Sequence, residues 1–472
     1  MKILLTGTTG YIAQRLLPKL LNDGHEVICC VRDAARFDAA RYRSEKISVI
    51  EVNFLHLPSL DAIPDDIDAA YYLIHSMSAK DEDFEVLEKS AANNFKERIQ
   101  RTRARQVIYL SGIINDETLS KHLSSRKSVE EVLSSATFPL TTLRAGIILG
   151  SGSASFEIIR DLVEKLPVMI APKWLNTRSQ PIAIRNVIEF LQGVLFFEYA
   201  YHKSFDIGGT EVLTYKEILL RFAKVRHLKR WIITVPVLTP KLSSYWLYFV
   251  TSTSFTLAKN LVKSMGVEIV CRKNDLAERL GIMLLTYEDA IRFAFDKIEH
   301  EEVVSRWTDA LSSNVLEEGI VKLSQVPAFG CFVDRRSNAV MNVQRTMDKI
   351  WSIGGDTGWY YANWLWVLRG FVDKLFGGVG LRRGRKNSTM ISAGDSLDFW
   401  RVLYADKKEQ RLLLYAEMKL PGEAWLEFKI TNNTLVQTAT FRPLGVLGRL
   451  YWYSVLPFHG CIFRGMLKAL TA

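Results

Sequence analysis

The sequence predicts an α/β protein in which a doubly wound parallel sheet is followed by a smaller α+β domain. The first third of the chain alternates short apolar runs with helical patterns, as expected where helices connect parallel strands. A glycine-rich turn follows the first apolar run, and seven of the eleven tryptophans lie in the last third. At 472 residues the chain is long enough for two or three domains with their own cores.

Six strands and three helices are expected in the first third. The strands are expected at Ile3–Thr6, Glu26–Arg32, Ile47–Val52, Ala69–Ile74, Gln106–Ser111 and Leu140–Arg144. The helices are expected at Tyr11–Asn22, Phe84–Arg101 and Ser125–Ser135. Helical patterns continue less regularly to about residue 300. We therefore assign residues 1–300 to one domain, with its substrate lobe at about residues 150–300.

The strongest functional signal is the turn after the first strand. Its glycines let the backbone approach a pyrophosphate, and the following helix offers free N–H groups and a positive dipole end. This order of strand, turn and helix predicts a Rossmann-type NAD(P)-binding domain; an ordinary strand-turn-helix is the alternative. The predicted cofactor contacts of the turn are Gly7, Thr8, Thr9, Gly10, Tyr11 and Ile12.

The end of the second strand bears on the choice of cofactor. An NAD site usually presents an acidic side chain to the ribose hydroxyls about twenty residues past the turn. Arg32 occupies this position, and a guanidinium suits a 2′-phosphate. The sequence thus favours NADP, with NAD possible because Asp33 follows directly.

Further cofactor contacts are expected where the next strands end, because the carboxyl ends of parallel strands surround the cofactor cleft. Asn53 and Phe54 follow the third strand, where contacts to adenine are expected. Ile74, His75 and Ser76 follow the fourth strand. A plain turn residue is the alternative for His75.

The last part of the chain is predicted to hold a connector and a separate domain. Residues 301–333 form the connector, and residues 334–472 form the domain. Turn signals separate strand-like runs that describe an antiparallel meander. These runs are Phe399–Leu403, Arg411–Lys419, Ala424–Thr431 and Val436–Arg442, and an apolar helix at Leu444–Leu470 follows them.

Charge and cysteine content narrow the classes of function. The net charge is +10, but residues 334–388 hold ten Lys and Arg against four acids, so the excess is largely local and no nucleic-acid surface is expected. The five cysteines are scattered without a C-x-x-C pair, which argues against disulfides and metal sites.

The stretches at Leu242–Ala258 and Leu450–Leu467 are too short or too polar to span a membrane. No secretory signal pattern is present. We expect a cytoplasmic protein with at most peripheral contact at the inner membrane face.

Several motifs resemble those of known NAD(P)-binding proteins. Residues 6–13, Arg32, residues 110–112 and residues 143–146 are similar to the atypical short-chain dehydrogenase/reductases of the NmrA-like type, over residues 1–300. Longer motifs resemble a bacterial NAD(P)-binding family that carries a C-terminal domain of unknown function. They include residues 144–153, 358–366, 377–385 and 451–459.

This resemblance implies hydride transfer, yet the Tyr-x-x-x-Lys pair usual on the helix after the fifth strand is missing. His122 and Arg126 are one helical turn apart in the corresponding stretch, and they are candidates for the acid and its electrostatic partner. Ser111, at the end of the fifth strand, lies where this superfamily usually has a catalytic or substrate-orienting serine, and it is a candidate for that role. The alternatives are a surface histidine and a turn serine without chemistry.

Other candidates lie on neighbouring strands. Arg144 ends the sixth strand and is expected either to bind an anionic substrate or to form a salt bridge. Tyr71 and Tyr72 are further candidate phenols, although strand alternation directs one of them into the core.

The meander and closing helix of residues 334–472 resemble the helix-grip fold of START-like lipid-binding domains. The resemblance implies a cavity for a small apolar molecule or lipid, with the alternative that the aromatic residues simply form a core. The aromatic candidates are Trp359, Tyr360, Trp364, Trp366, Trp400, Trp425, Tyr451 and Trp452. The polar residues expected to orient a ligand or pair with one another are Glu417, Lys419, Arg442 and His459.

Taken together, these features predict an NAD(P)H-dependent oxidoreductase, with NADP favoured, that acts on an apolar or lipid-like substrate. A non-catalytic NAD(P)-binding redox sensor is one alternative. A lipid-binding or membrane-associated protein that keeps the dinucleotide as a structural element is another.

Overall fold

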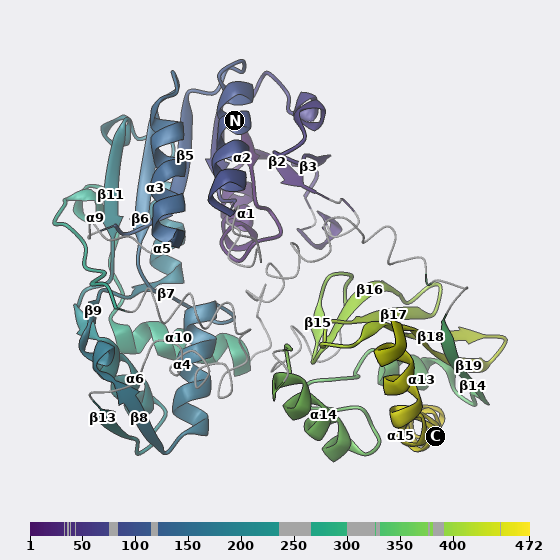
Figure 1. Ribbon diagram of the computed structural model, residues 1–472. Helices are drawn as coiled ribbons and strands as arrows, with labels where there is room; N and C mark the ends of the chain where they lie inside the picture. Colours follow the sequence, from purple (N-terminus) through teal and green to yellow (C-terminus); the bar gives the residue numbers. More distant parts are fainter. Residues whose placement is uncertain are drawn as a thin grey trace. The chain divides into compact units, whose positions relative to one another are not determined.

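The computed structural model describes most of the chain, in two compact units (Figure 1). The first unit contains the described residues up to 299, and the second contains those from 326. The described residues are 1–32, 34, 37, 39–42, 44–74, 84–114, 121–235, 266–299, 326, 331–375, 378–380, 391–443 and 445–472. Most of the predicted connector and the apolar stretch Leu242–Ala258 lie outside these residues.

The first unit is built on a seven-stranded sheet in which every pair of neighbouring strands is parallel. The strand order is β11-β6-β5-β4-β1-β2-β3, so the direction of winding reverses between β1 and β4. The strands are β1 (Lys2–Leu5), β2 (Glu26–Val31), β3 (Ile47–Glu51), β4 (Ala69–Tyr72), β5 (Gln106–Gly112), β6 (Leu140–Ala145) and β11 (Lys203–Ile207). The predicted doubly wound sheet is confirmed, and β11 is a seventh strand that the sequence pattern did not predict.

Helices cover both faces of this sheet because successive strand residues point to opposite sides. Ile3 and Leu5 pack in one core with α1 (Ala13–Asn22) and α5 (Ile184–Gly193). Leu4 packs in a second core with α2 (Phe84–Ile99) and α3 (Lys121–Ser134). Short 3-10 helices occur at Ala39–Tyr42, Leu57–Ala62, Lys173–Asn176 and Glu198–Ala200.

The predicted substrate lobe of the first unit consists of helices and pairs of short strands. Its helices α4 (Ala154–Lys165), α6 (Tyr215–Val225) and α10 (Tyr287–Glu299) meet through Phe156, Phe222 and Phe295, whose ring centroids are 5.3–5.7 Å apart. The other elements of the lobe in the described residues are β7 (Ile148–Leu149), β8 (Val168–Pro172), β9 (Arg178–Ser179), β10 (Ile182–Ala183), β12 (Leu213–Thr214), β13 (Trp231–Val235) and α9 (Leu276–Arg279).

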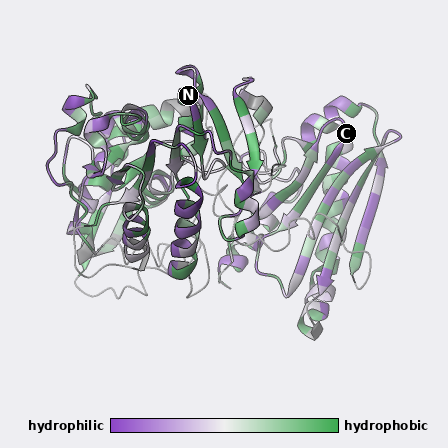
Figure 2. Ribbon diagram, turned by 90° about the horizontal axis from the view of Figure 1, so that it is seen from above, coloured by the Kyte–Doolittle hydropathy of each residue, from purple (hydrophilic) through white to green (hydrophobic). Residues whose placement is uncertain are grey.

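The second unit is a six-stranded antiparallel sheet with the order β14-β19-β18-β17-β16-β15. Its first and last strands, β14 (Phe332–Ala339) and β19 (Thr434–Pro443), are therefore neighbours. The strands between them in the order are β15 (Ser396–Leu397), β16 (Trp400–Asp406), β17 (Arg411–Ala416) and β18 (Gly422–Thr431). Hydrophobic and hydrophilic residues alternate along the strands of this sheet, as Figure 2 shows.

Three helices complete the part of the second unit that the structure describes. Helices α13 (Val343–Ile350) and α14 (Asn363–Leu375) lie between β14 and β15 in the chain, and α15 (Gly445–Thr471) follows β19. The predicted meander and closing helix are confirmed, whereas β14, α13 and α14 were not predicted. Among the helices that the structure describes, none has the length and apolar character needed to span a membrane.

Candidate functional site

The turn between β1 and α1 depends on two glycines. Gly7 has a φ of +64°, and a Cβ atom there would lie 2.6 Å from the carbonyl oxygen of Leu73. A Cβ atom at Gly10 would lie 2.9 Å from the carbonyl oxygen of Gly7. The turn thus requires a left-handed conformation and a close approach to the end of β4. It lies where the strand order reverses, which is where open parallel sheets bind ligands.

Two threonine hydroxyls hold this turn in place. Thr6 Oγ1 donates to the carbonyl of Tyr71 at 2.9 Å and accepts from the amide of Leu73 at 3.0 Å, which ties β1 to the end of β4. Thr8 Oγ1 directs its single proton toward the carbonyls of Leu5 in β1 and Cys30 in β2, at 2.8 and 3.1 Å. The Thr8 side chain therefore shapes the turn, and any contact of Thr8 with a cofactor falls to its backbone.

The start of α1 is suited to a phosphate. Ile12 occupies the N-cap position and makes no side-chain capping bond. The N–H groups of Gln14 and Arg15 already donate to the carbonyls of Gly10 and Ile12 at 3.1 and 3.0 Å, so the donors for a phosphate are the amides that precede them. The first turn of α1 contains no acidic residue. Backbone donors and the positive end of the helix dipole therefore lie beside the glycine turn. No carboxylate in the first turn of α1 competes with a phosphate for them.

Tyr11 connects the turn to the loop that precedes α4. The Arg15 guanidinium stacks on the Tyr11 ring at 3.8 Å and donates to the carbonyl of Ser151 at 2.8 Å. A Cβ atom at Gly150 would lie 2.6 Å from the Tyr11 hydroxyl. Burial raises the pKa of Tyr11 to about 12, against the opposing charge of Arg15. The side chain of Tyr11 is therefore neutral and packs against Arg15, and its contact with a cofactor stays a prediction.

Arg32 lies directly after β2 and is exposed, at the position expected for the 2′ substituent of the ribose. The neighbouring strand β3 ends at Glu51, whose carboxylate accepts from the amide of Ala34 at 2.8 Å. Asp33 lies outside the described residues. An exposed guanidinium at this strand end is compatible with a phosphate, and its role stays a prediction.

The residues expected at the adenine differ in accessibility. Asn53 is exposed, and its side-chain oxygen accepts from the amide of Leu55 at 3.0 Å. Phe54 is 7% exposed and packs on Phe95 of α2, with ring centroids 5.7 Å apart. The Phe54 side chain is thus part of the core, and the Phe54 carbonyl accepts from the side-chain amide of Asn94 at 2.7 Å.

The remaining sequence candidates are only partly described. Ile74 is half-buried after β4, whereas His75, Ser76 and the side chain of His122 lie outside the described residues. Ser111 is 1% exposed near the end of β5. Arg126 of α3 is half-buried, and its carbonyl accepts from the hydroxyl of Tyr109 at 3.4 Å. The roles of Ser111, His122 and Arg126 therefore stay predictions.

The two tyrosines of β4 are core residues. Tyr71 is fully buried and donates to the carbonyl of Leu191 at 2.9 Å. Tyr72 is buried on the opposite face, where it packs edge-on against Phe95 at 4.8 Å. Burial raises the pKa of both phenols. Neither tyrosine presents an accessible phenol for proton transfer.

Arg144 forms ion pairs at the end of β6. Its Nε donates to Glu130 of α3 at 3.0 Å, and its guanidinium lies 3.8 Å from Asp206 of β11. Arg272 pairs with the same Asp206 at 2.8 Å. These contacts favour the salt-bridge role over binding of an anionic substrate, because two carboxylates already balance the two arginines.

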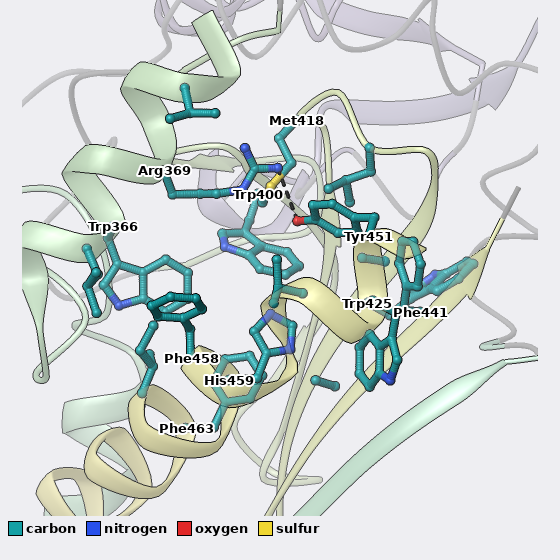
Figure 3. A pocket seen from close by; sticks show the side chains of 18 of the residues that line it. Trp366, Arg369, Trp400, Met418, Trp425, Phe441, Tyr451, Phe458, His459 and Phe463 are labelled. Atoms are coloured by element: carbon teal, nitrogen blue, oxygen red, sulfur yellow. Dashed lines mark hydrogen bonds between the residues drawn. The ribbon is translucent and has the colours of Figure 1, made fainter. Parts of the chain in front are cut away.

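The second unit contains a cavity of about 330 Å³ between α14, α15 and the sheet (Figure 3). Five of the aromatic candidates line it, namely Trp366, Trp400, Trp425, Tyr451 and Trp452. Trp359 instead lies in the core, where its Nε1 donates to Asp398 at 2.7 Å, and Trp364 is 67% exposed. The sequence pattern missed Arg369, which lines the cavity from α14.

Two of the polar candidates of this unit, Glu417 and Arg442, form ion pairs with residues that were not among the candidates. Glu417 forms an ion pair with the buried Arg401 at 3.0 Å, and Arg442 pairs with Glu423 at 2.8 Å. His459 lines the cavity, and burial lowers its pKa to about 4. His459 is therefore neutral at pH 7.

Comparison with known proteins supports the division into two parts. Residues 7–159 match the model of a family described as NAD(P)H-binding. The first unit thus contains an NAD(P)-binding domain of the Rossmann type. Residues 331–466 match the model of a family described as a protein of unknown function, DUF2867. No curated protein matches the chain.

Two solved structures share the fold of the first unit. A nucleoside-diphosphate-sugar epimerase from Staphylococcus aureus is 13% identical with a TM-score of 0.50, and the match covers 62% of this chain and 100% of that chain. The Bordetella bronchiseptica enzyme WbmG, in complex with NAD, is 13% identical with a TM-score of 0.50, covering 65% and 96%. At this identity the likeness establishes the fold alone.

Proposed function

We propose that the protein is an NAD(P)H-dependent oxidoreductase of the atypical, NmrA-like type that prefers NADP and reduces an apolar or lipid-like carbonyl or enone. The observation that carries the proposal is the turn at Gly7 and Gly10 before the uncapped start of α1. When bound there, the nicotinamide supplies a hydride. The chain positions the pyrophosphate through backbone N–H groups, and Ser111, His122 and Arg126 are the proposed groups for orienting the substrate and supplying a proton.

The preference for NADP is assigned to Arg32. Arg32→Ala should weaken NADPH binding about tenfold and leave NADH binding within about twofold, since a charge-assisted contact to the 2′-phosphate is lost. Lys46→Ala is the control, because Lys46 precedes β3, which is parallel to β2, and so lies at the opposite end of these strands from Arg32. Fluorescence titration measures both affinities. Unchanged NADPH affinity in Arg32→Ala would mean that the assignment is wrong.

The cavity of the second unit is proposed to hold the apolar substrate or ligand. The adjacency of the first and last strands, together with the long C-terminal helix, supports a START-like, helix-grip interpretation of this unit. The cavity has the size and apolar lining typical of small-molecule sites.

Turnover separates this proposal from a redox sensor. Purified protein should oxidise NADPH with at least one member of a panel of lipophilic carbonyls and quinones, and Gly7→Val should abolish this activity. If NADPH binds but no compound is reduced, the oxidoreductase proposal fails. The sensor alternative then predicts different affinities for the oxidised and reduced cofactor.

The outer faces of two helices favour a second candidate function, attachment to an anionic bilayer surface. The exposed apolar residues of these faces are Trp364, Val367, Leu368, Phe371 and Leu375 of α14 and Leu447, Leu450, Tyr453, Leu456 and Phe458 of α15, each at least 40% exposed. The cations of the two helices are Arg369, Lys374, Arg449, Arg464 and Lys468. Their single acid, Asp373, is 1% exposed. Exposed apolar groups among cations suit an anionic membrane.

Vesicle flotation tests this attachment. The full chain should float with phosphatidylserine-containing vesicles at low salt and be released as salt is added. Phe371→Ser and Leu450→Ser should each reduce the bound fraction by about threefold or more, because an inserted apolar group is lost. Trp231→Ser, at a 70% exposed position in the first unit, is the control. Failure of the wild-type protein to float would exclude this candidate.

A further inference from the structure

The cavity of the second unit opens between α14 and α15. Leu368 of α14 and Phe458 of α15 both line the cavity, and they are 49% and 58% exposed. The deeper walls include Trp400, Trp425 and Phe463, which are buried. A ligand can therefore enter between the helices and place an apolar part among the aromatic side chains (Figure 3).

Arg369 is the one charged residue among the twenty described residues that line the cavity, since His459 is neutral at pH 7. Arg369 is half-buried, and its guanidinium donates to the Tyr451 hydroxyl at 3.3 Å. Figure 3 shows this pair side by side at one end of the cavity. In this arrangement the hydroxyl oxygen accepts from Arg369, so the hydroxyl proton is available to a further acceptor.

No carboxylate in the described parts of the chain forms an ion pair with Arg369. The acid one turn further along α14, Asp373, is 1% exposed and accepts from the amides of Gly380 at 2.8 Å and Lys419 at 2.7 Å. A cation beside an apolar cavity gains most from an anion that enters with the ligand, because desolvation strengthens the pairing. The donor set of a guanidinium and a phenol hydroxyl matches the planar, two-oxygen geometry of a carboxylate.

The volume limits the apolar part of the ligand. About 330 Å³ lies near the lower end of the range for small-molecule sites, roughly 300 to 1,000 Å³. A single chain or a compact ring system fits such a volume, whereas a lipid with two long acyl chains does not.

We propose that this cavity binds a single-chain carboxylate, with the carboxylate on Arg369 and Tyr451 and the chain among the aromatic walls. The inference rests on the proposed function, because it specifies the class of apolar ligand that the cavity holds. It adds the sign of the ligand's charge and the two residues that recognise it.

Calorimetric titration of the full chain at pH 7.5, without cofactor, tests the proposal with decanoate, decanol and decylamine. Decanoate should bind about tenfold more tightly than decanol, and decylamine more weakly than either, because only the carboxylate pairs with Arg369. Quenching of tryptophan fluorescence gives a second readout, since four tryptophans line the cavity.

Variants assign the preference to named groups. Arg369→Gln should remove the advantage of decanoate over decanol and leave decanol affinity within about twofold, whereas Arg369→Lys should retain part of the advantage. Tyr451→Phe should weaken decanoate about threefold to tenfold through loss of one hydrogen bond. Arg464→Gln is the control, because Arg464 is an exposed arginine of α15 that does not line the cavity.

Equal affinity of the wild-type protein for decanoate and decanol would overturn the proposal, as would an unchanged preference in Arg369→Gln. If Arg369→Gln does not fold, Arg369→Lys and Tyr451→Phe still decide the outcome. Absence of binding by any decyl compound overturns both this inference and the assignment of an apolar ligand to the cavity. NADPH binding and oxidation are measured separately, so their failure is distinguishable from failure here.

Discussion

The dinucleotide turn and the C-terminal cavity are built from different chemical groups. The turn consists of consecutive residues, and its shape depends on Gly7 and Gly10, where a side chain would collide with backbone oxygens. The cavity is lined by side chains from α14, α15 and three strands of the second sheet. Backbone groups form the first site, and side chains form the second.

This difference determines where specificity resides. Backbone N–H groups bind the pyrophosphate that NAD and NADP share, so the turn cannot distinguish these cofactors, and discrimination falls to a separate side chain such as Arg32. In the cavity, one charged side chain among apolar neighbours determines the ligand class. We therefore expect substitutions in the turn to affect fold and binding together, and substitutions in the cavity to separate them.

The largest effect is expected at Gly7. Gly7→Ala forces a Cβ atom to within 2.6 Å of a backbone oxygen at a φ of +64°. NADPH affinity should fall about a hundredfold or more, and the free energy of unfolding should fall by about 2 to 4 kcal/mol. Urea unfolding and NADPH titration measure the two effects.

Gly24→Ala is the matched control for this substitution. Gly24 also has a positive φ, +85°, but its Cβ would meet only the flexible end of Lys46 at 3.8 Å. This variant should lose about 1 kcal/mol of stability and keep its NADPH affinity. Equal NADPH affinity in the two variants would contradict the account of the turn.

The first unit was largely predictable because its signals are local. Strand, glycine turn and helix follow one another within the first 22 residues, and the six predicted strands agree with the structure to within two residues at their ends. The missed strand β11 joins the sheet through pairing with β6, about sixty residues earlier in the chain. Partners of Arg144 on α3 and β11 were equally unpredictable, because they depend on long-range packing.

The sequence predicted that the second unit holds an apolar cavity, but it identified only some of the residues that line this cavity. Helix α14 was missed because apolar residues lie on both its buried and its exposed faces. The exposed apolar positions 364, 367, 368, 371 and 375 have helical spacing, so they could have revealed this helix and with it Arg369. Which tryptophan enters the core and which lines the cavity depends on packing among distant elements.

His459 should make the second unit sensitive to acid, and this is the next largest effect. Burial lowers its pKa to about 4; nearby Asp334 opposes this, whereas Arg336 and Arg369 reinforce it. Between pH 6.5 and about 4 the unfolded chain binds a proton that the folded chain does not. The free energy of unfolding should therefore decrease as the pH falls through this range, by up to about 3 kcal/mol.

His459→Phe separates this contribution from that of other titrating groups. The substitution keeps the ring contacts with Trp452 and Phe463, which lie 5.4 and 4.9 Å from the histidine ring. The variant should lose less stability than the wild type between pH 7 and pH 4.5. Tryptophan fluorescence during urea unfolding reports on this unit, which holds seven of the eleven tryptophans. An identical loss in both proteins would contradict the role of His459.

The smallest effect on stability is expected from filling the cavity. Ala439 of β19 lines the cavity, so Ala439→Leu should place its added atoms in empty volume and change stability by less than about 1 kcal/mol. Decanoate affinity should nevertheless fall about tenfold, because the new side chain occupies space that the ligand needs.

Ala416→Leu is the control at a buried alanine that does not line the cavity, and overpacking there should cost about 1 to 3 kcal/mol. Calorimetry and urea unfolding of both variants give the comparison. If Ala439→Leu destabilised the protein as much as Ala416→Leu, binding and folding would be coupled in the cavity as they are in the turn.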